Sequence, residues 1–227
     1  HTAMTEGAPV LSVRDLHFPA LPPMTFDIRR GEIAFLRDEN YNTGRRLHEC
    51  FLGDRGWTSG FFRLNGRLYQ PGDLGRVIGS EIGIQIERPD RPGGVLFDNM
   101  TALDNLCTSL IPKAGQHIIR KKIVSSILSE ALRWFPKEML LQPLSSWSYP
   151  ERLRFSYYRW YLLNPKLLIC FFPFAGQESA HHKMIIDLLV LCAQRGMAVW
   201  IISSGIDAIC EKTDNEEFLR RLHYLNK

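Results

Sequence analysis

Two apolar runs in the second half of the chain decide the fold: Lys166-Leu-Leu-Ile-Cys-Phe-Phe172 and Met197-Ala-Val-Trp-Ile-Ile202. Between them, from about Ala180 to Gln194, the pattern is that of an amphipathic helix. Continuous apolar runs are typical of strands that are buried on both faces, and a helix between two such strands is typical of a parallel sheet. The sequence therefore predicts an α/β core in which these two strands run parallel.

The first half predicts a third buried strand, at residues 32–36, followed by a loop and a helix. A polar cluster at residues 37–42 ends the strand, and Leu47 and Phe51 then recur at helical spacing up to Gly53. Shorter strand patterns on either side predict an antiparallel β flank, and one of them ends in an Asn-Gly turn. The flank strands are expected at residues 10–13, 24–28 and 59–66, and a further strand is expected at residues 81–86.

The middle of the chain predicts a helical subdomain at about residues 95–163. Pro and Gly are concentrated at residues 89–94, and helical patterns follow at 101–111, 118–134 and 150–163. We expect a single domain over residues 5–214. Residues 1–4 are interpreted as a tag remnant and start, and residues 215–227 as a C-terminal helix that could link to a further domain.

Composition excludes several classes of protein. The 227 residues are 45% hydrophobic and 23% charged, which excludes a disordered tail, a collagen or a coiled coil. The net charge of +4 is too diffuse to indicate nucleic-acid binding. No apolar run approaches the roughly 20 residues that span a bilayer, and the five cysteines contain no CxxC pair. We therefore expect a cytoplasmic domain, membrane-associated only through a partner, without a metal site.

The order of parts from Trp147 to Asp214 resembles the ATP-binding cassette (ABC) ATPases. A polar turn is followed by a helix that ends in Arg159-Trp-Tyr-Leu-Leu-Asn-Pro165, then by the first apolar strand with Pro173, and finally by the second strand with Ser203-Ser204. This order is most similar to the second cassette of bacterial ribose or galactose importers. The resemblance covers about residues 10–214 and implies a P-loop NTPase core with an antiparallel β flank and a helical subdomain.

The phosphate loop that the resemblance implies has unusual residues here. An ABC loop follows GxxxxGK[ST], but residues 38–46 read Asp-Glu-Asn-Tyr-Asn-Thr-Gly-Arg-Arg. In one register Arg45 replaces the lysine and Arg46 the magnesium ligand; in the other, Gly44 takes the lysine position. All twelve basic residues before Lys113 are arginines, so no lysine is available. In both registers a carboxylate lies where phosphate is expected, and like charges 4 Å apart repel by about 4 kcal/mol at an effective dielectric of about 20.

The two other motifs of the cassette also differ from the family pattern. Phe171 and Phe172 stand where the Walker B Asp-Glu pair is expected, and neither ring can bind a metal or accept a proton. We interpret both as core aromatics at a strand end. In the signature loop, the two glycines are replaced by a tyrosine and a proline. That degenerate signature consists of Ser148, Tyr149, Pro150 and Glu151.

Arginines are the candidates for binding an anionic ligand, because guanidinium forks bind phosphates and carboxylates bidentately. The alternative, which we favour, is internal pairing with the nearby carboxylates of Asp38, Glu39, Glu87 and Asp90. Gln85 is either the Q-loop residue or a solvated strand residue. Phe18, which follows the first strand, either stacks on a base or belongs to the core. The ligand-binding candidates are Gly44, Arg45, Arg46, Arg88, Arg91 and Phe18.

These substitutions predict a pseudo-ATPase that is not an enzyme and takes no cofactor, neither ATP nor magnesium. Three roles remain open. The chain is a non-catalytic partner of another cassette or of a membrane permease subunit. It is a sensor that binds a small anionic nucleotide, such as a cyclic dinucleotide, and signals to an output domain on the same chain. Or it is a weak ATPase subunit of a sugar importer.

Overall fold

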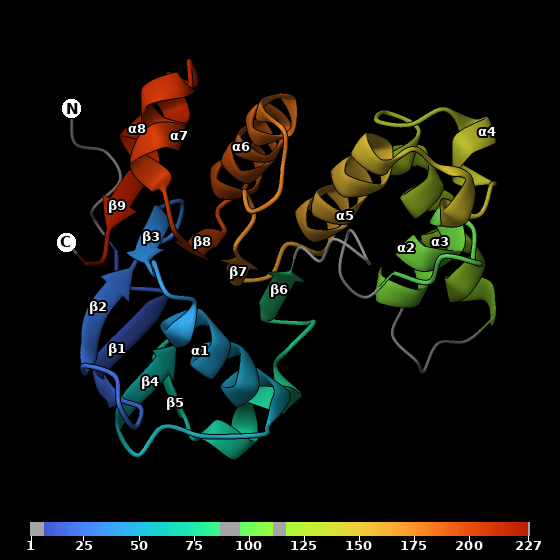
Figure 1. Ribbon diagram of the computed structural model, residues 1–227. Helices are drawn as coiled ribbons and strands as arrows, with labels where there is room; N and C mark the ends of the chain where they lie inside the picture. Colours follow the sequence, from blue (N-terminus) through green and yellow to red (C-terminus); the bar gives the residue numbers. More distant parts are fainter. Residues whose placement is uncertain (1–6, 87–95, 111–116, 227) are drawn as a thin grey trace.

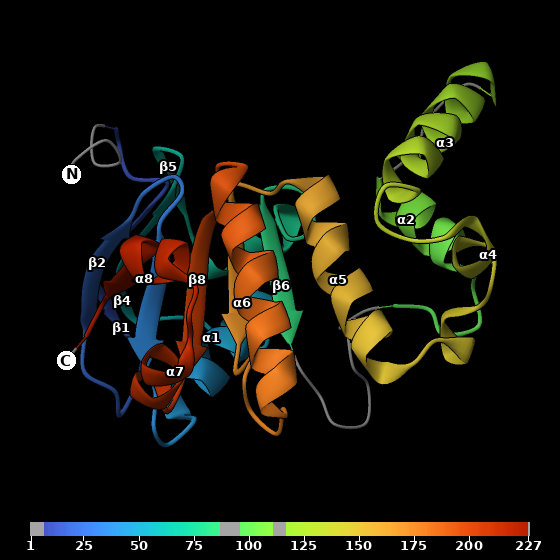
Figure 2. The ribbon, with the colours of Figure 1, turned by 90° about the horizontal axis from the view of Figure 1, so that it is seen from above.

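Two β-sheets form the body of the molecule, and a group of helices stands at one end of it (Figure 1). The structure is a computed structural model that describes residues 7–86, 96–110 and 117–226. Within these ranges, no helix is both long enough and apolar enough to cross a bilayer. Figure 2 shows the antiparallel sheet at one side, the parallel sheet beside it and the helices beyond.

The five-stranded sheet is parallel throughout and has the strand order β6-β7-β8-β3-β9. Its central strands are those that the apolar runs predict, and Trp200 pairs with Ile169 on one side and with Ala34 on the other. The predicted α/β core is therefore confirmed. The strands are β3 (Ile33–Arg37), β6 (Ile82–Ile86), β7 (Leu167–Phe171), β8 (Ala198–Ser203) and β9 (Leu222–Tyr224).

The second sheet is the predicted antiparallel flank, with the order β2-β1-β4-β5. The turn between β4 and β5 is formed by Asn65 and Gly66, both at positive φ (50° and 77°), as a tight Asn-Gly hairpin requires. The strands are β1 (Leu11–His17), β2 (Met24–Ile28), β4 (Ser59–Leu64) and β5 (Arg67–Tyr69).

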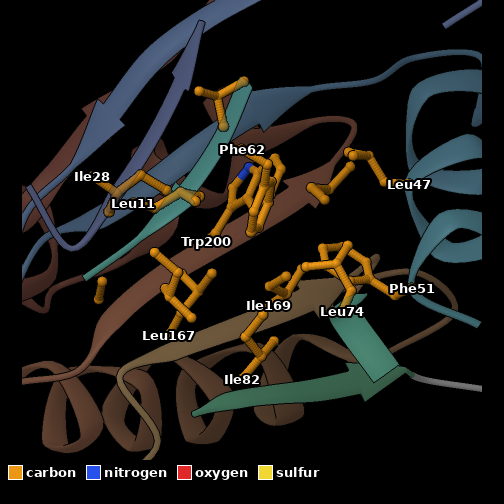
Figure 3. Packing of buried hydrophobic residues seen from close by; sticks show 14 of the residues in the cluster. Leu11, Ile28, Leu47, Phe51, Phe62, Leu74, Ile82, Leu167, Ile169 and Trp200 are labelled. Carbon is orange, nitrogen blue, oxygen red and sulfur yellow. The ribbon is translucent and has the colours of Figure 1, made fainter. Parts of the chain in front are cut away.

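The main core lies between the two sheets. Trp200 of β8 is fully buried there, with its ring centroid 5.1 Å from that of Phe26 in an edge-to-face arrangement. Figure 3 shows Trp200 and Phe62 among apolar side chains from both sheets and from α1 (Asn42–Leu52). The inner side of α1 contributes Leu47 and Phe51, and Gly53 ends this helix at φ 84°, as predicted. One layer of side chains therefore joins the flank, the central sheet and α1.

The other face of the parallel sheet is covered by helices. Side chains of β3, β7 and β8 pack there against α5 (Tyr149–Leu163), α6 (Ser179–Gln194) and α7 (Ile206–Lys212). The predicted helical subdomain has its own core, in which Leu106, Trp147, Phe155 and Tyr158 are buried. Its expected start at residue 95 lies outside the described residues. Its other helical segments are α2 (Ala102–Leu110), α3 (His117–Ala131), α4 (Lys137–Leu140) and η2 (Leu144–Ser146).

The C-terminal segment differs from the single helix predicted for residues 215–227. Helix α8 (Glu216–Arg221) is short, and Leu222–Tyr224 form β9, which pairs with β3. The Asn226 amide continues this pairing, since it bonds both backbone groups of Arg37 at 2.7 and 2.9 Å. The prediction was wrong because local periodicity does not reveal the free edge of β3, whose backbone groups need partners.

Candidate functional site

A hollow of about 310 Å³ lies at the carboxyl ends of β3 and β7, beside the first turn of α1. Open α/β sheets bind ligands at this edge. Four residues selected from the sequence line the hollow: Gly44, Arg45, Phe171 and Phe172. The other described lining residues are Asn40, Tyr41, Asn42, His48 and Ile86, so none of the described lining residues is acidic.

The first turn of α1 is occupied by the carboxylate of Asp38. Its Oδ2 accepts a hydrogen bond from the Gly44 N–H at 2.7 Å, and its Oδ1 accepts one from the Thr43 N–H at 3.3 Å. Asp38 is only 6% exposed, and its own N–H donates to the Ser203 carbonyl at 2.9 Å. The amide groups at the start of a helix favour negative charge. Asp38 therefore takes the position that a bound anion would take.

Two aromatic rings border the same helix start. The Tyr41 and Phe172 ring centroids are 4.5 Å apart, and both residues have positive φ, 59° and 50°. Such backbone is strained for residues with a side chain, and strain of this kind clusters at functional sites. A Cβ atom on Gly44 would lie 2.8 Å from the Phe172 ring, so only glycine fits there. Phe171 is 3% exposed and is a core residue as interpreted, whereas Phe172 is half-buried and lines the hollow.

The arginines separate into different roles. Arg45 lines the hollow, is exposed and makes no ion pair with any residue in the described ranges. Arg46 lies 3.4 Å from Glu49, and Glu39 lies 3.5 Å from Arg37. The expected pairing of Arg45 and Arg46 with Asp38 and Glu39 is not formed, because Arg46 lies against Glu49, Glu39 against Arg37, and Asp38 against helix amides. Glu87 and Asp90, the other two carboxylates of that expectation, lie outside the described residues. The candidates Arg88 and Arg91 lie outside the described residues.

Phe18 is not part of the hollow. Its ring is 2% exposed and belongs to the core cluster between the two sheets. A base needs an open ring face for stacking, and this ring presents none. The structure corresponds to the core alternative that the sequence left open.

The residues aligned with the signature loop form the start of α5. The Ser148 N–H and Oγ both donate to Oε2 of Glu151, at 3.3 and 2.9 Å. Pro150 lies in the first turn, where its missing N–H costs little, and the Tyr149 hydroxyl accepts a hydrogen bond from Gln177 at 2.5 Å. None of the four is among the described residues that line the hollow.

This arrangement predicts that Ser148→Ala lowers the free energy of unfolding by about 1 kcal/mol, a typical cost of losing a residue that caps a helix. Urea denaturation measures the change. Ser145→Ala is the matched control, since its exposed hydroxyl makes no hydrogen bond with the described residues. Equal stabilities of the two variants would contradict the role of Ser148.

A buried polar cluster joins β6 to α5. Gln85 is 1% exposed; its amide donates to the Ser156 hydroxyl at 3.0 Å and accepts from the Trp160 indole at 2.7 Å. The solvated alternative for Gln85 is therefore wrong. Next to it, the Arg159 guanidinium lies 4.6 Å from the Trp160 ring, and burial lowers its pKa to about 10, so it stays protonated at neutral pH. The cluster connects the central sheet to the helical subdomain.

Sequence reasoning missed the part that Asp38 plays at α1. The pattern does contain a signal, since Asp is one of the residues preferred at the start of a helix. Asp38, however, stands four positions before the first helical residue, Asn42. Only the path of the intervening loop brings the carboxylate back to the Gly44 amide.

Sequence similarity to known proteins covers nearly the whole chain. No family model matches it. A putative ribose/galactose/methyl galactoside import ATP-binding protein of Pseudomonas syringae pv. tomato is 25% identical over 212 residues, which are 92% of this chain and 40% of that protein. The galactofuranose transporter ATP-binding protein of Escherichia coli K12 is 24% identical over 88% of this chain and 39% of its own. The chain thus spans about 40% of the length of these relatives.

Solved structures agree with this similarity at the level of the fold. The cbiO1 protein from Clostridium perfringens, part of an ABC transporter complex, superposes with a TM-score of 0.73 over 96% of this chain and 85% of its own, at 20% identity. A dimeric post-hydrolysis cassette bound to ADP and Pi gives a TM-score of 0.62 over 95% of this chain and 94% of its own, at 17% identity. The chain therefore has the fold of the ABC-type cassettes, and its sequence is similar to those of sugar-import ATP-binding proteins. The predicted resemblance and fold class are confirmed.

The comparisons correct two expectations about this cassette. Its relatives are named ATP-binding proteins, so the expectation of a protein that is not an enzyme is wrong, and so is the expectation that it takes no nucleotide cofactor. Both expectations were based on substitutions at single motif positions such as Phe171 and Phe172. The order of strands, helices and motifs, which resembles that of ATP-binding proteins, was given less weight. In the structure, Gly44 and Arg45 still lie together at the first turn of α1, beside the hollow.

Proposed function

We propose that the cassette binds ATP in the hollow beside α1, as the nucleotide-binding part of a sugar importer. One observation carries this proposal: the cation of Arg45, which has no ionic partner among the described residues, lines a hollow at a helix N-terminus, at the carboxyl edge of a parallel sheet. Helix amides and guanidinium groups both bind phosphate oxygens. The similarity to ribose and galactose import proteins over 92% of the chain supports this role over that of a second-messenger sensor.

In this proposal Asp38 changes partners when the nucleotide binds. Phosphate oxygens take the Gly44 and Thr43 amides, which now donate to Asp38. The displaced carboxylate would repel the phosphates unless a cation lay between them. Magnesium is commonly held by one or two carboxylates together with substrate phosphates, so Asp38 is the residue that would hold it. The ion would supply charge neutralisation, and Arg45, which lines the hollow, would add a fixed positive charge.

We further propose that the cassette acts with a second cassette and with a membrane permease. The relatives are import proteins more than twice as long as this chain, so their length leaves room for another cassette. One structural neighbour is a dimer of cassettes. The import reaction and its sugar belong to that assembly, and the chain contributes its nucleotide site.

Arg45→Gln tests the nucleotide site. A hydrogen bond to a charged group contributes about 1.5 to 3 kcal/mol, so the substitution should weaken ATP binding by at least about tenfold. Titration calorimetry with magnesium present measures the affinity. Arg63→Gln on β4 is the matched control, because Arg63 is exposed and does not line the hollow. Unchanged ATP affinity in Arg45→Gln, or an equal loss in the control, would overturn the proposal.

A further inference from the structure

A larger hollow, of about 590 Å³, lies at the opposite edge of the parallel sheet. Its lining includes Gly31, Lys166 and Gly196, which directly or nearly precede the first residues of β3, β7 and β8. Because these strands are parallel, their amino ends meet at one edge, and the ATP hollow lies at the other. The two hollows share no described lining residue and are separate sites.

Basic side chains dominate this second hollow. They come from four different segments: the β2–β3 turn, the α5–β7 turn, the end of α6 and the end of α8. No Asp or Glu is among the described residues that line it. The basic residues are Arg29, Arg30, Lys166, Arg195 and Arg221.

Only part of this charge is neutralised within the protein. Arg221 is paired with Glu217 at 2.6 Å and donates to the Gly31 carbonyl at 2.9 Å. Arg195 donates to the Tyr161 carbonyl and lies 4.8 Å from that ring, and Arg29 donates to a backbone carbonyl. Among the described residues, the side chains of Arg30 and Lys166 have neither an ion pair nor a hydrogen bond.

The ends of α5 and α6 also face this region, and each helix C-terminus carries roughly half a negative charge. Together they offset about one of the four cations that make no ion pair with a described carboxylate, and Asp27 acts electrostatically on one of these four, Arg29. The hollow therefore keeps a clear excess of positive charge. An anion with two or more charged groups would remove the repulsion between these cations.

The Arg30 guanidinium is held against the backbone at Gly196. This glycine has φ 105°, and a Cβ atom there would lie 2.5 Å from the Arg30 Nε. The absence of a side chain at Gly196 thus lets Arg30 lie over the α6–β8 turn, beside Arg195. Two guanidinium groups from different segments are brought to one hollow, an arrangement suited to bidentate binding of phosphate.

We infer that this hollow binds a small phosphorylated molecule that carries at least two phosphate charges. Arg30 and Lys166 are its principal ligands, since the other cations also have partners within the protein. The site is independent of ATP binding at α1, and its occupant bridges the turns that precede β3, β7 and β8.

Inorganic pyrophosphate is the probe, and titration calorimetry on the full chain measures its affinity. The double variant Arg30→Gln with Lys166→Gln should bind it at least tenfold more weakly than the unaltered protein. Lys166→Gln alone should show part of this loss, which keeps the test usable if the double variant unfolds. Arg133→Gln with Lys137→Gln is the matched control: it removes the same two charges from the helical subdomain and should leave the affinity unchanged.

Arg45→Gln separates this site from the ATP hollow: it should weaken only the pyrophosphate that binds beside α1, and the binding that is lost in the Arg30 and Lys166 variants should persist in it. Three results would overturn the inference. The first is that the unaltered protein binds no pyrophosphate at millimolar concentration, and the second is that the control pair loses as much affinity as the Arg30 and Lys166 variants. The third result is a loss of pyrophosphate affinity in Arg45→Gln without a loss in the Arg30 and Lys166 variants.

Discussion

Asp38→Asn should bind magnesium-free ATP at least tenfold more tightly than the unaltered protein. The carboxylate now accepts from the Gly44 and Thr43 amides, where phosphate oxygens are proposed to bind. Two like charges 4 Å apart repel by about 4 kcal/mol at an effective dielectric of about 20, and about 1.4 kcal/mol is already a factor of ten in affinity. Asparagine keeps the shape of the side chain and one acceptor oxygen for the Gly44 N–H.

Magnesium should affect the two proteins differently. In the unaltered protein the ion neutralises the Asp38 carboxylate and the phosphates together, so ATP affinity should rise with magnesium. In Asp38→Asn the rise should be smaller, because one ligand of the ion is missing. Titration calorimetry in magnesium and in a chelator gives all four affinities.

Asp54→Asn provides the matched control, since this exposed carboxylate follows the other end of α1 and makes no ion pair with the described residues. It should change neither affinity. The loss of a negative charge at a partly buried helix start costs up to about 2 kcal/mol, which is less than the roughly 5 to 15 kcal/mol of an ordinary domain, so Asp38→Asn should remain folded. Unchanged or weaker binding of magnesium-free ATP by Asp38→Asn would contradict the proposed exchange of partners.

Trp200→Ala should lower the free energy of unfolding by about 3 to 5 kcal/mol, the usual range for removing a large buried aromatic side chain. Trp200 is fully buried on the central strand β8, and its ring lies edge-to-face with Phe26 of the flanking sheet. Removing it leaves a cavity between the two sheets. Since stable domains unfold with only about 5 to 15 kcal/mol, much of the fold's stability would be lost. Urea denaturation measures the change.

Trp200→Phe is the comparison that isolates packing. The Trp200 Nε1 atom is buried and has no hydrogen-bond partner within the described ranges, so its removal relieves an unsatisfied polar group. Phenylalanine should therefore cost about 1.5 kcal/mol or less, although it is smaller. Similar losses in the alanine and phenylalanine variants would show that the layer between the sheets does not depend on the volume of this ring.

The parts of the fold that depend on local pattern were predictable. The apolar runs at residues 166–172 and 197–202 correspond to β7 and β8, because strands buried on both faces contain few polar residues. Gly53 and Asn65-Gly66 marked a helix end and a turn, because positive φ favours these residues. β9 was not predictable, since a strand of three residues exists only through its pairing with the edge of β3.

The site was predictable in position but not in its contacts. The order of strand, loop and helix placed Gly44 and Arg45 at the end of β3, where the hollow is found. The sequence did not predict that Asp38 bonds to the first turn of α1, that Arg45 has no ionic partner among the described residues, or that Gln85 is buried. Each of these depends on which segments meet, and distances between such segments are not contained in residue spacing.

By itself the sequence determined that this chain has an α/β cassette fold, because hydrophobic periodicity and the order of motifs are properties of neighbouring residues. Only the tertiary structure decided which charges have partners. Asp38 is satisfied by helix amides that follow it, whereas Arg30 and Lys166 are brought together from segments more than a hundred residues apart. The physical reason is that an electrostatic interaction depends on distance and burial in space, and the folded chain sets both.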